Sequence, residues 1–140
     1  MAEDHPAGEP GVPVLDLAFD SATLDAVRAG VKAHACEAGL SEDRVEDVVL
    51  AVHELAANAV CHGAGAGRLR IWKLAGSLDC EVEDGVPASG GPLPSRPGHG
   101  LWLVRQVADR MRVLSGARGT RATIAFDLPA RRQGQGCLQS

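Results

Sequence analysis

The chain has 140 residues, 45% of them apolar, and a formal net charge of −4 at pH 7. This length and composition fit one globular domain with a core of ordinary size. Because the charge is mildly acidic and the basic residues are scattered, we expect no direct nucleic-acid partner and no polybasic membrane anchor.

The amino-terminal residues lack the basic flank and apolar run of a signal peptide, and no apolar run reaches membrane-spanning length, so we expect a cytoplasmic protein. The 4 cysteines are widely separated without a Cys-x-x-Cys pair. This spacing argues against a zinc ribbon and a secreted disulfide framework, and it predicts reduced thiols that mostly fill the core. Residues 1–11 and 130–140 have little to bury and are predicted to be disordered, leaving residues 12–129 as one domain.

The first half of the domain is predicted to form a strand and two helices. Residues 14–19 alternate apolar and polar side chains, as a half-buried strand does. Asp20 or Ser21 can cap the next helix, in which apolar residues recur at helical spacing until a glycine ends it. Ser41, followed by two acidic residues, predicts the start of a second helix, and the glycine-rich residues 63–67 end it.

Residues 68–74 and 78–84 are strand-like, and the break between them is short enough for a hairpin. A loop rich in Gly and Pro follows over residues 85–97. The next helix is predicted to begin near His99, and its expected buried face comprises Leu101, Val104, Ala108 and Met111.

Two final strands are predicted at residues 112–114 and 122–128, around a turn at 115–120. The order is therefore β-α-α-β-β-α-β-β, which lacks the strict alternation of a doubly wound sheet. We predict an α+β fold: a two-layer α/β sandwich with three helices on one face of a mixed, mostly antiparallel sheet.

A polar stripe marks the second helix. Glu54, Asn58 and His62 follow one another at intervals of four, and Asp47 lies about two turns earlier on the same stripe. The surrounding residues are mostly Val, Leu and Ala, which predicts a half-buried helix whose stripe faces a pocket. The alternative is a solvent-facing stripe on an ordinary amphipathic helix.

Three local motifs suggest specific chemistry. His53-Glu54 imitates the start of a zinc-protease helix, but Ala57 stands where the second histidine ligand is needed. The glycines of residues 63–67 follow a helix and precede a strand, the reverse of a dinucleotide loop. Gly98-His99-Gly100-Leu101 leads into a helix whose first free amides can bind phosphate oxygens.

Asp84 ends a strand, where its side chain can leave the sheet and enter a pocket. A carboxylate there can accept a hydrogen bond from an exocyclic amine. The alternative is a loop aspartate that caps a turn.

These motifs occur together and in a fixed order. The chain contains Glu54-x-x-x-Asn58-Ala59-x-x-His62-Gly63, then Asp84, then Arg96-Pro97-Gly98-His99-Gly100-Leu101-Trp102-Leu103-Val104, then Gly119-Thr120. In this order they resemble the ATP-binding domain of the GHKL superfamily, and more narrowly the small actinobacterial anti-sigma-factor serine/threonine kinases. The resemblance covers residues 14–128 and implies a Bergerat-type ATP-binding fold.

The resemblance implies a role for each motif residue. It assigns Glu54 to polarising the attacking hydroxyl, Asn58 to holding Mg²⁺ against the phosphates, and Asp84 to the adenine amine. Thr120 supports the adenine, and Arg96 reaches the terminal phosphate. Gly98, His99, Gly100 and Leu101 form the phosphate-binding motif. His62 lies near the phosphate end, although a plain helix-terminal role fits equally well.

The implied cofactors are ATP and Mg²⁺, and the implied partners are a sigma factor, a small STAS-type antagonist protein and a second copy of the chain. One residue departs from the family pattern: Val86 stands where the adenine motif usually has its second glycine. A β-branched residue is strained at positive φ. The departure leaves a second function open, a non-catalytic nucleotide-binding module that docks a protein partner. A detached histidine-kinase catalytic domain is less attractive, because no phospho-acceptor helix precedes the domain.

Overall fold

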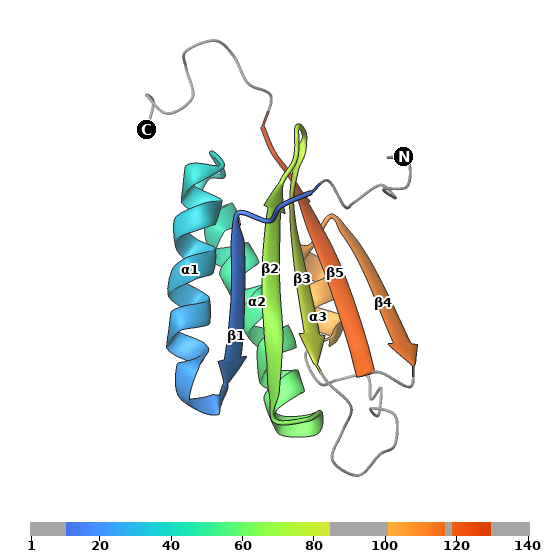
Figure 1. The fold of residues 1–140 in the computed structure, drawn as a ribbon. Coiled ribbons are helices and arrows are strands. Elements are labelled where there is room, and N and C mark those ends of the chain that lie inside the picture. The colour runs from blue at the N-terminus through green and yellow to red at the C-terminus, as the bar shows by residue number, and fades with distance from the viewer. Residues whose placement is uncertain (1–10, 85–100, 117–118, 130–140) are drawn as a thin grey trace.

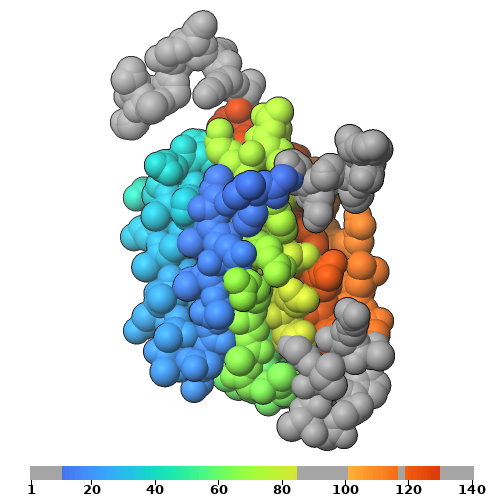
Figure 2. Space-filling view, viewed as in Figure 1, coloured from blue at the N-terminus to red at the C-terminus, as the bar shows by residue number. Residues whose placement is uncertain are grey.

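In the computed structural model, which describes residues 11–84, 101–116 and 119–129, three α-helices cover one face of a five-stranded sheet (Figure 1). The strand order is β1-β2-β3-β5-β4, and every ladder is antiparallel. The two-layer α+β fold is confirmed, with a sheet that is antiparallel throughout its described ladders. Figure 2 shows the sheet face that the helices leave open.

The predicted capping residues precede the first two helices, although only Ser41 caps its α-helix directly. Asp20 Oδ1 accepts a hydrogen bond from the Ala22 amide at 2.9 Å and caps a single 3₁₀ turn, η2 (Ser21–Thr23), which leads into α1 (Leu24–Glu37). Ser41 Oγ accepts from the Arg44 amide at 3.2 Å and caps α2 (Glu42–His62). Gly63 follows the last residue of α2, so the predicted glycine stop is confirmed.

The strands differ from their predicted bounds by one to three residues at most of their ends, and four residues of the predicted turn at 115–120 lie in strands. They are β1 (Leu15–Asp20), β2 (Ala66–Lys73), β3 (Ser77–Asp84), β4 (Arg110–Gly116) and β5 (Gly119–Asp127). β2 and β3 form the predicted hairpin, closed by a hydrogen bond from the Leu74 amide to the Ser77 carbonyl oxygen at 2.8 Å. The register pairs Ile71 with Cys80, so the apolar residues of both strands share the face under the helices.

The third helix ends earlier than predicted. α3 spans Leu101–Val107, and its predicted start near His99 lies outside the described residues. Met111, expected on the buried face of this helix, lies instead on β4 opposite Ile124. Met111 still packs against the core, but it does so from β4. Helical spacing alone therefore gave the wrong element for this residue.

The core lies between the sheet and the helices. Its fully buried large side chains include Leu69, Ile71, Ile124 and Phe126 from the sheet, with Val31, Val48 and Val52 from the helices. The buried face of α2 also carries three alanines, Ala51, Ala56 and Ala59, each at most 2% exposed. Because alanine is short, α2 can approach the sheet closely.

The cysteines only partly fill the core. Cys80 is fully buried, and burial raises the pKa of its thiol. Cys36 and Cys61 are exposed on the helices, contrary to the prediction that most cysteines fill the core. All three are free thiols, as predicted. No helix among the described residues has the length and apolarity needed to cross a membrane.

Arg44 joins three elements beside the core. Its Nη1 donates to Asp47 Oδ2 and to the Val107 carbonyl oxygen, each at 2.9 Å, and its Nη2 donates to Asp109 Oδ2 at 2.9 Å. The guanidinium carbon also lies 5.1 Å from the centroid of the Phe126 ring. Arg44 therefore fixes the start of α2 against the end of α3 and against the sheet.

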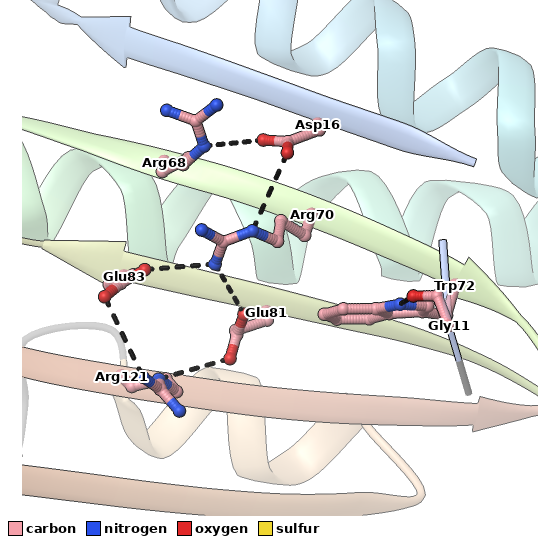
Figure 3. A network of polar contacts seen from close by, with 8 residues as sticks. All are labelled: Gly11, Asp16, Arg68, Arg70, Trp72, Glu81, Glu83 and Arg121. Atoms are coloured by element: carbon pink, nitrogen blue, oxygen red, sulfur yellow. Dashed lines mark hydrogen bonds and ion pairs between the residues drawn. The ribbon is translucent and has the colours of Figure 1, made fainter. Parts of the chain in front are cut away.

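A network of ion pairs crosses the open face of the sheet (Figure 3). Glu81, at 7% exposed, bonds to Arg70 Nη1 at 3.0 Å and to Arg121 Nε at 3.2 Å. Asp16 extends the network to β1, because its Oδ2 lies 3.8 Å from Arg70 Nε and its Oδ1 pairs with Arg68 Nε at 2.6 Å. Charges on four strands thus alternate in sign and satisfy one another, which keeps the nearly buried Glu81 carboxylate paired.

Candidate functional site

Asp84 lies buried at the end of β3. Its side chain is on the helix-facing side of the sheet, and Asp84 Oδ1 accepts a hydrogen bond from the Thr120 amide of β5 at 3.0 Å. Burial raises the pKa of the Asp84 carboxyl, and the bond from the Thr120 amide opposes part of this rise. The predicted strand-end position of Asp84 is confirmed, and Thr120, which the resemblance assigns to the same adenine, lies beside it.

Gly63, at the end of α2, gives Asp84 its space. A Cβ at residue 63 would lie 2.5 Å from Asp84 Oδ2 and 2.9 Å from the Ala59 carbonyl oxygen. Neither distance is compatible with a side chain, so only glycine lets this helix end meet this strand end. Figure 1 shows the last turn of α2, the end of β3 and the start of β5 at the same end of the molecule.

A hollow of about 360 Å³ opens beside Asp84. Its walls come from the ends of β3, β4 and β5, and its lining includes Asp84, Ser115, Gly119 and Thr120. Three segments far apart in the sequence therefore meet around one carboxylate beside an open hollow. They are the end of α2 at Gly63, the end of β3 at Asp84 and the start of β5 at Thr120.

The polar stripe of α2 divides into two parts. Glu54 and Asn58 are half-buried, and His62 is exposed in the last turn. Asn58 precedes Gly63 by five residues, about 7.5 Å along a helix axis, so it belongs to the Asp84 end of the molecule. Asp47 is eleven residues from Asn58, about 16 Å along the helix, and pairs with Arg44. Asp47 therefore has a structural partner away from the candidate site.

The remaining predicted site residues are placed as follows. Leu101 is the first residue of α3, half-buried and packed against the core. Arg96, Gly98, His99 and Gly100 lie outside the described residues, as does Val86.

The described residues fit a nucleotide in their chemistry. Asp84 offers a carboxylate acceptor, which suits the exocyclic amine of adenine. Asn58 offers one carboxamide oxygen, a ligand type that Mg²⁺ accepts while it keeps waters and phosphate oxygens. Among the described residues no group of three or more His, Cys, Asp or Glu side chains is placed to hold a metal ion.

Comparison with known families agrees with this geometry. Residues 17–126 match the family model of the histidine kinase-like ATPase domain. The chain belongs to this family. Membership of the histidine kinase-like ATPase domains implies a nucleotide site, and the matched residues include Glu54, Asn58, Asp84 and Thr120.

A solved structure shares the fold. The crystal structure of the RsbU and RsbW domains of Rv1364c from Mycobacterium tuberculosis superposes with a TM-score of 0.64 at 24% sequence identity. The match covers 85% of this chain and 34% of that one, so this chain corresponds to about a third of the longer protein. Comparison with curated proteins gives no match.

The sequence motifs do not predict the contacts that Gly63 and Arg44 make in the structure. Gly63 was interpreted as a helix stop, and its fit against Asp84 depends on residues 21 positions apart in the chain. The sequence motifs give Arg44 no role. Because the first turn of a helix favours acidic residues, an arginine there is a signal of a specific contact.

Proposed function

We propose that this histidine kinase-like ATPase domain is a Mg-ATP-dependent serine/threonine protein kinase of the anti-sigma-factor type, acting in the cytoplasm. The observation that carries the proposal is the buried Asp84 carboxylate, held by the Thr120 amide against Gly63 at the end of the helix that bears Glu54 and Asn58. Family membership supports the nucleotide, and the order of motifs supports the kinase class.

In this proposal Asp84 accepts from the adenine amine and Thr120 supports the same ring. Asn58 holds Mg²⁺, which when bound neutralises charge on the phosphates. Glu54 takes the proton of a serine or threonine hydroxyl, the hydroxyl oxygen attacks the terminal phosphorus of ATP, and ADP leaves. Arg96 and the Gly98 to Leu101 motif contact the phosphates, with His62 near them.

The partners in this proposal are a sigma factor, sequestered in one state, and a small STAS-type antagonist protein, phosphorylated in the other. The RsbW domain named in the structural neighbour supports this class of partner. Switching between these partners regulates transcription.

A second candidate is a nucleotide-binding module that docks a partner without phosphoryl transfer. Val86, in place of the usual second glycine of the adenine motif, favours this candidate. Both candidates require nucleotide binding, and they differ only in the chemistry at Glu54.

The first experiment tests the metal assignment. Asn58→Ala should lose Mg-dependent ATP binding in a calorimetric titration, because it removes the carboxamide oxygen. Glu46→Gln, on the same helix and exposed, is the matched control and should bind as wild type does. An unchanged affinity in Asn58→Ala, with its circular dichroism intact, contradicts the assignment.

The second experiment separates binding from catalysis. Glu54→Gln should keep nucleotide affinity within a few-fold, while transfer of labelled phosphate to an antagonist protein falls by roughly two to four orders of magnitude. Wild-type protein that binds ATP and transfers no phosphate to any antagonist supports the binding module.

We also propose that the protein is a homodimer, in line with the kinases it resembles. Light scattering at micromolar concentration should give twice the 14.5 kDa chain mass. A monomer both with and without nucleotide contradicts the dimer and leaves the nucleotide site unaffected.

A further inference from the structure

A groove of about 550 Å³ runs between α1 and α2, away from the candidate nucleotide site. Its lining includes the apolar side chains of Leu40, Val45, Val49 and Leu50. Leu50 is 38% exposed, which makes it one of few large apolar residues on the described surface.

The groove and the polar stripe occupy different faces of α2. At 100° per residue, Glu46, Val49 and His53 point in nearly one direction, and Asn58 points about 140° from His53. An occupant of the groove therefore approaches α2 from a side that leaves Asn58 and Asp84 uncovered.

Charge is distributed unevenly along the groove. The two helices run antiparallel, and Arg28 of α1 lies across from His53 of α2, with Arg28 Nη1 3.3 Å from His53 Nδ1. Lys32 lies one turn further along α1. This end of the groove is basic, although Arg28 also forms an ion pair with Asp25 of its own helix.

The other end is acidic. Glu42 and Glu46 line it from the first turns of α2. Within the described part of the chain, Lys32, Glu42 and Glu46 form no ion pair, unlike the sheet-face charges, which are paired with one another. Their charges remain available to a partner.

From these observations we propose that the α1–α2 groove docks an amphipathic helix of a partner protein. The partner helix has an apolar stripe that covers Leu50 and Val49, acidic residues toward Arg28 and Lys32, and basic residues toward Glu42 and Glu46. The α2 side of the groove runs from Glu42 to His53, a rise of about 16 Å, which accommodates three turns. This proposal rests on the proposed function, because it locates the docking of a protein partner on the α1–α2 groove. Its test needs neither nucleotide nor phosphoryl transfer.

The test uses three synthetic helical peptides with the same leucine stripe. The first has glutamates in one half and lysines in the other, the second has only glutamates, and the third has only lysines. Fluorescence anisotropy should give affinity about tenfold higher for the first peptide than for either of the others. Equal affinities for all three, or no binding of the first at about 1 mM, overturns the proposal.

Protein variants locate the binding. Leu50→Asp should weaken the first peptide about tenfold or more, since it places a charge in the apolar contact. Leu114→Asp, at a 55% exposed leucine of β4, is the matched control and should leave the affinity unchanged. The double variant Lys32→Glu, Glu46→Lys should lower it as well. If Leu50→Asp binds as wild type does, the peptide sits elsewhere and the proposal is wrong.

A second copy of the chain is the competing occupant. Sedimentation of wild type and Leu50→Asp at equal concentration distinguishes it. Dissociation of a wild-type dimer by Leu50→Asp assigns the groove to self-association and overturns the proposal, whereas an unchanged oligomeric state together with lost peptide binding supports it.

Discussion

In the proposed nucleotide site a single buried carboxylate, Asp84, serves recognition at the expense of its own solvation. Burial raises the pKa of the Asp84 carboxyl above its ordinary value of 3.8. Only the ionised form accepts from the adenine amine without a competing proton. We therefore expect ATP affinity, measured by titration calorimetry, to fall as pH is lowered through a midpoint above 3.8.

The effect of the Asp84 ionisation on folding stability has the opposite sign to its effect on ATP affinity. Because the folded-state pKa is raised, protonated Asp84 favours the folded protein, and this contribution is lost as pH rises through the folded pKa. Asp84→Asn should therefore be at least as stable as wild type at neutral pH, while its ATP affinity falls about tenfold or more, the usual effect of losing a bond to a charged acceptor. Comparing both proteins removes the ionisation of ATP itself. A pH profile of affinity that Asp84→Asn shares with wild type would show that Asp84 is not the titrating group.

Gly63 allows a second prediction for one residue. Gly63→Ala should lower the free energy of unfolding by about 1–3 kcal/mol, because its Cβ meets both Asp84 and the Ala59 backbone. Gly76→Ala is the control, since a Cβ there meets nothing within 4 Å and should change stability by less than about 0.5 kcal/mol. Urea unfolding of both variants measures the difference. Equal midpoints would mean that the end of α2 shifts without resistance.

At the scale of elements, Arg44 is predicted to hold α2 and α3 together. Arg44→Ala should cost about 2–3 kcal/mol of unfolding free energy, because it removes the donor to the Val107 carbonyl oxygen and leaves Asp109 Oδ2 with only the Asp127 amide. Arg44→Lys should recover only part of this, since an ammonium cannot donate in a fork.

Arg110→Ala is the matched comparison for Arg44. Arg110 also pairs with an aspartate, Asp127, at 2.8 Å, but both side chains are more than half exposed. Its loss should cost less than about 1 kcal/mol in the same urea series. Similar losses for the two arginines would contradict the central role given to Arg44.

Elements specified by neighbouring residues were predictable from the sequence. Ser41 caps α2 through a bond to a residue three positions away, and the β2–β3 turn closes within four residues. Met111 was assigned wrongly because its spacing from Leu101 fits a helix, while the pairing of β4 with β5 decides its conformation. That pairing depends on residues further along the chain.

The candidate site was predictable as a set of residues and not as a geometry. The motif order selects Asn58, Asp84 and Thr120, and Asp84 and Thr120 prove to be bonded. The contact between Asp84 and Gly63 depends on how closely α2 approaches the sheet. This distance is set by packing and has no signature in the motif.

For the whole molecule, the site exists only when the chain is folded, since Gly63, Asp84 and Thr120 come from separate elements. ATP with Mg²⁺ at a hundredfold excess over its Kd should therefore raise the free energy of unfolding by about 2.7 kcal/mol. Thermal unfolding followed by circular dichroism measures this rise. GTP at the same concentration should give a smaller rise, because its carbonyl oxygen would face the Asp84 acceptor. Equal shifts for the two nucleotides contradict adenine recognition by Asp84.

The three alanines on the buried face of α2 make the site depend on residues that meet no ligand. The distance between the axis of α2 and the sheet depends on these small side chains, Ala51, Ala56 and Ala59. The position of Gly63, at the end of the helix, depends on the same distance. Two chains with identical Asn58 and Asp84 can thus differ in affinity through the volume of one core side chain. Within a family, loss or recovery of nucleotide binding is then open to evolution by core substitution, while every motif residue stays in place.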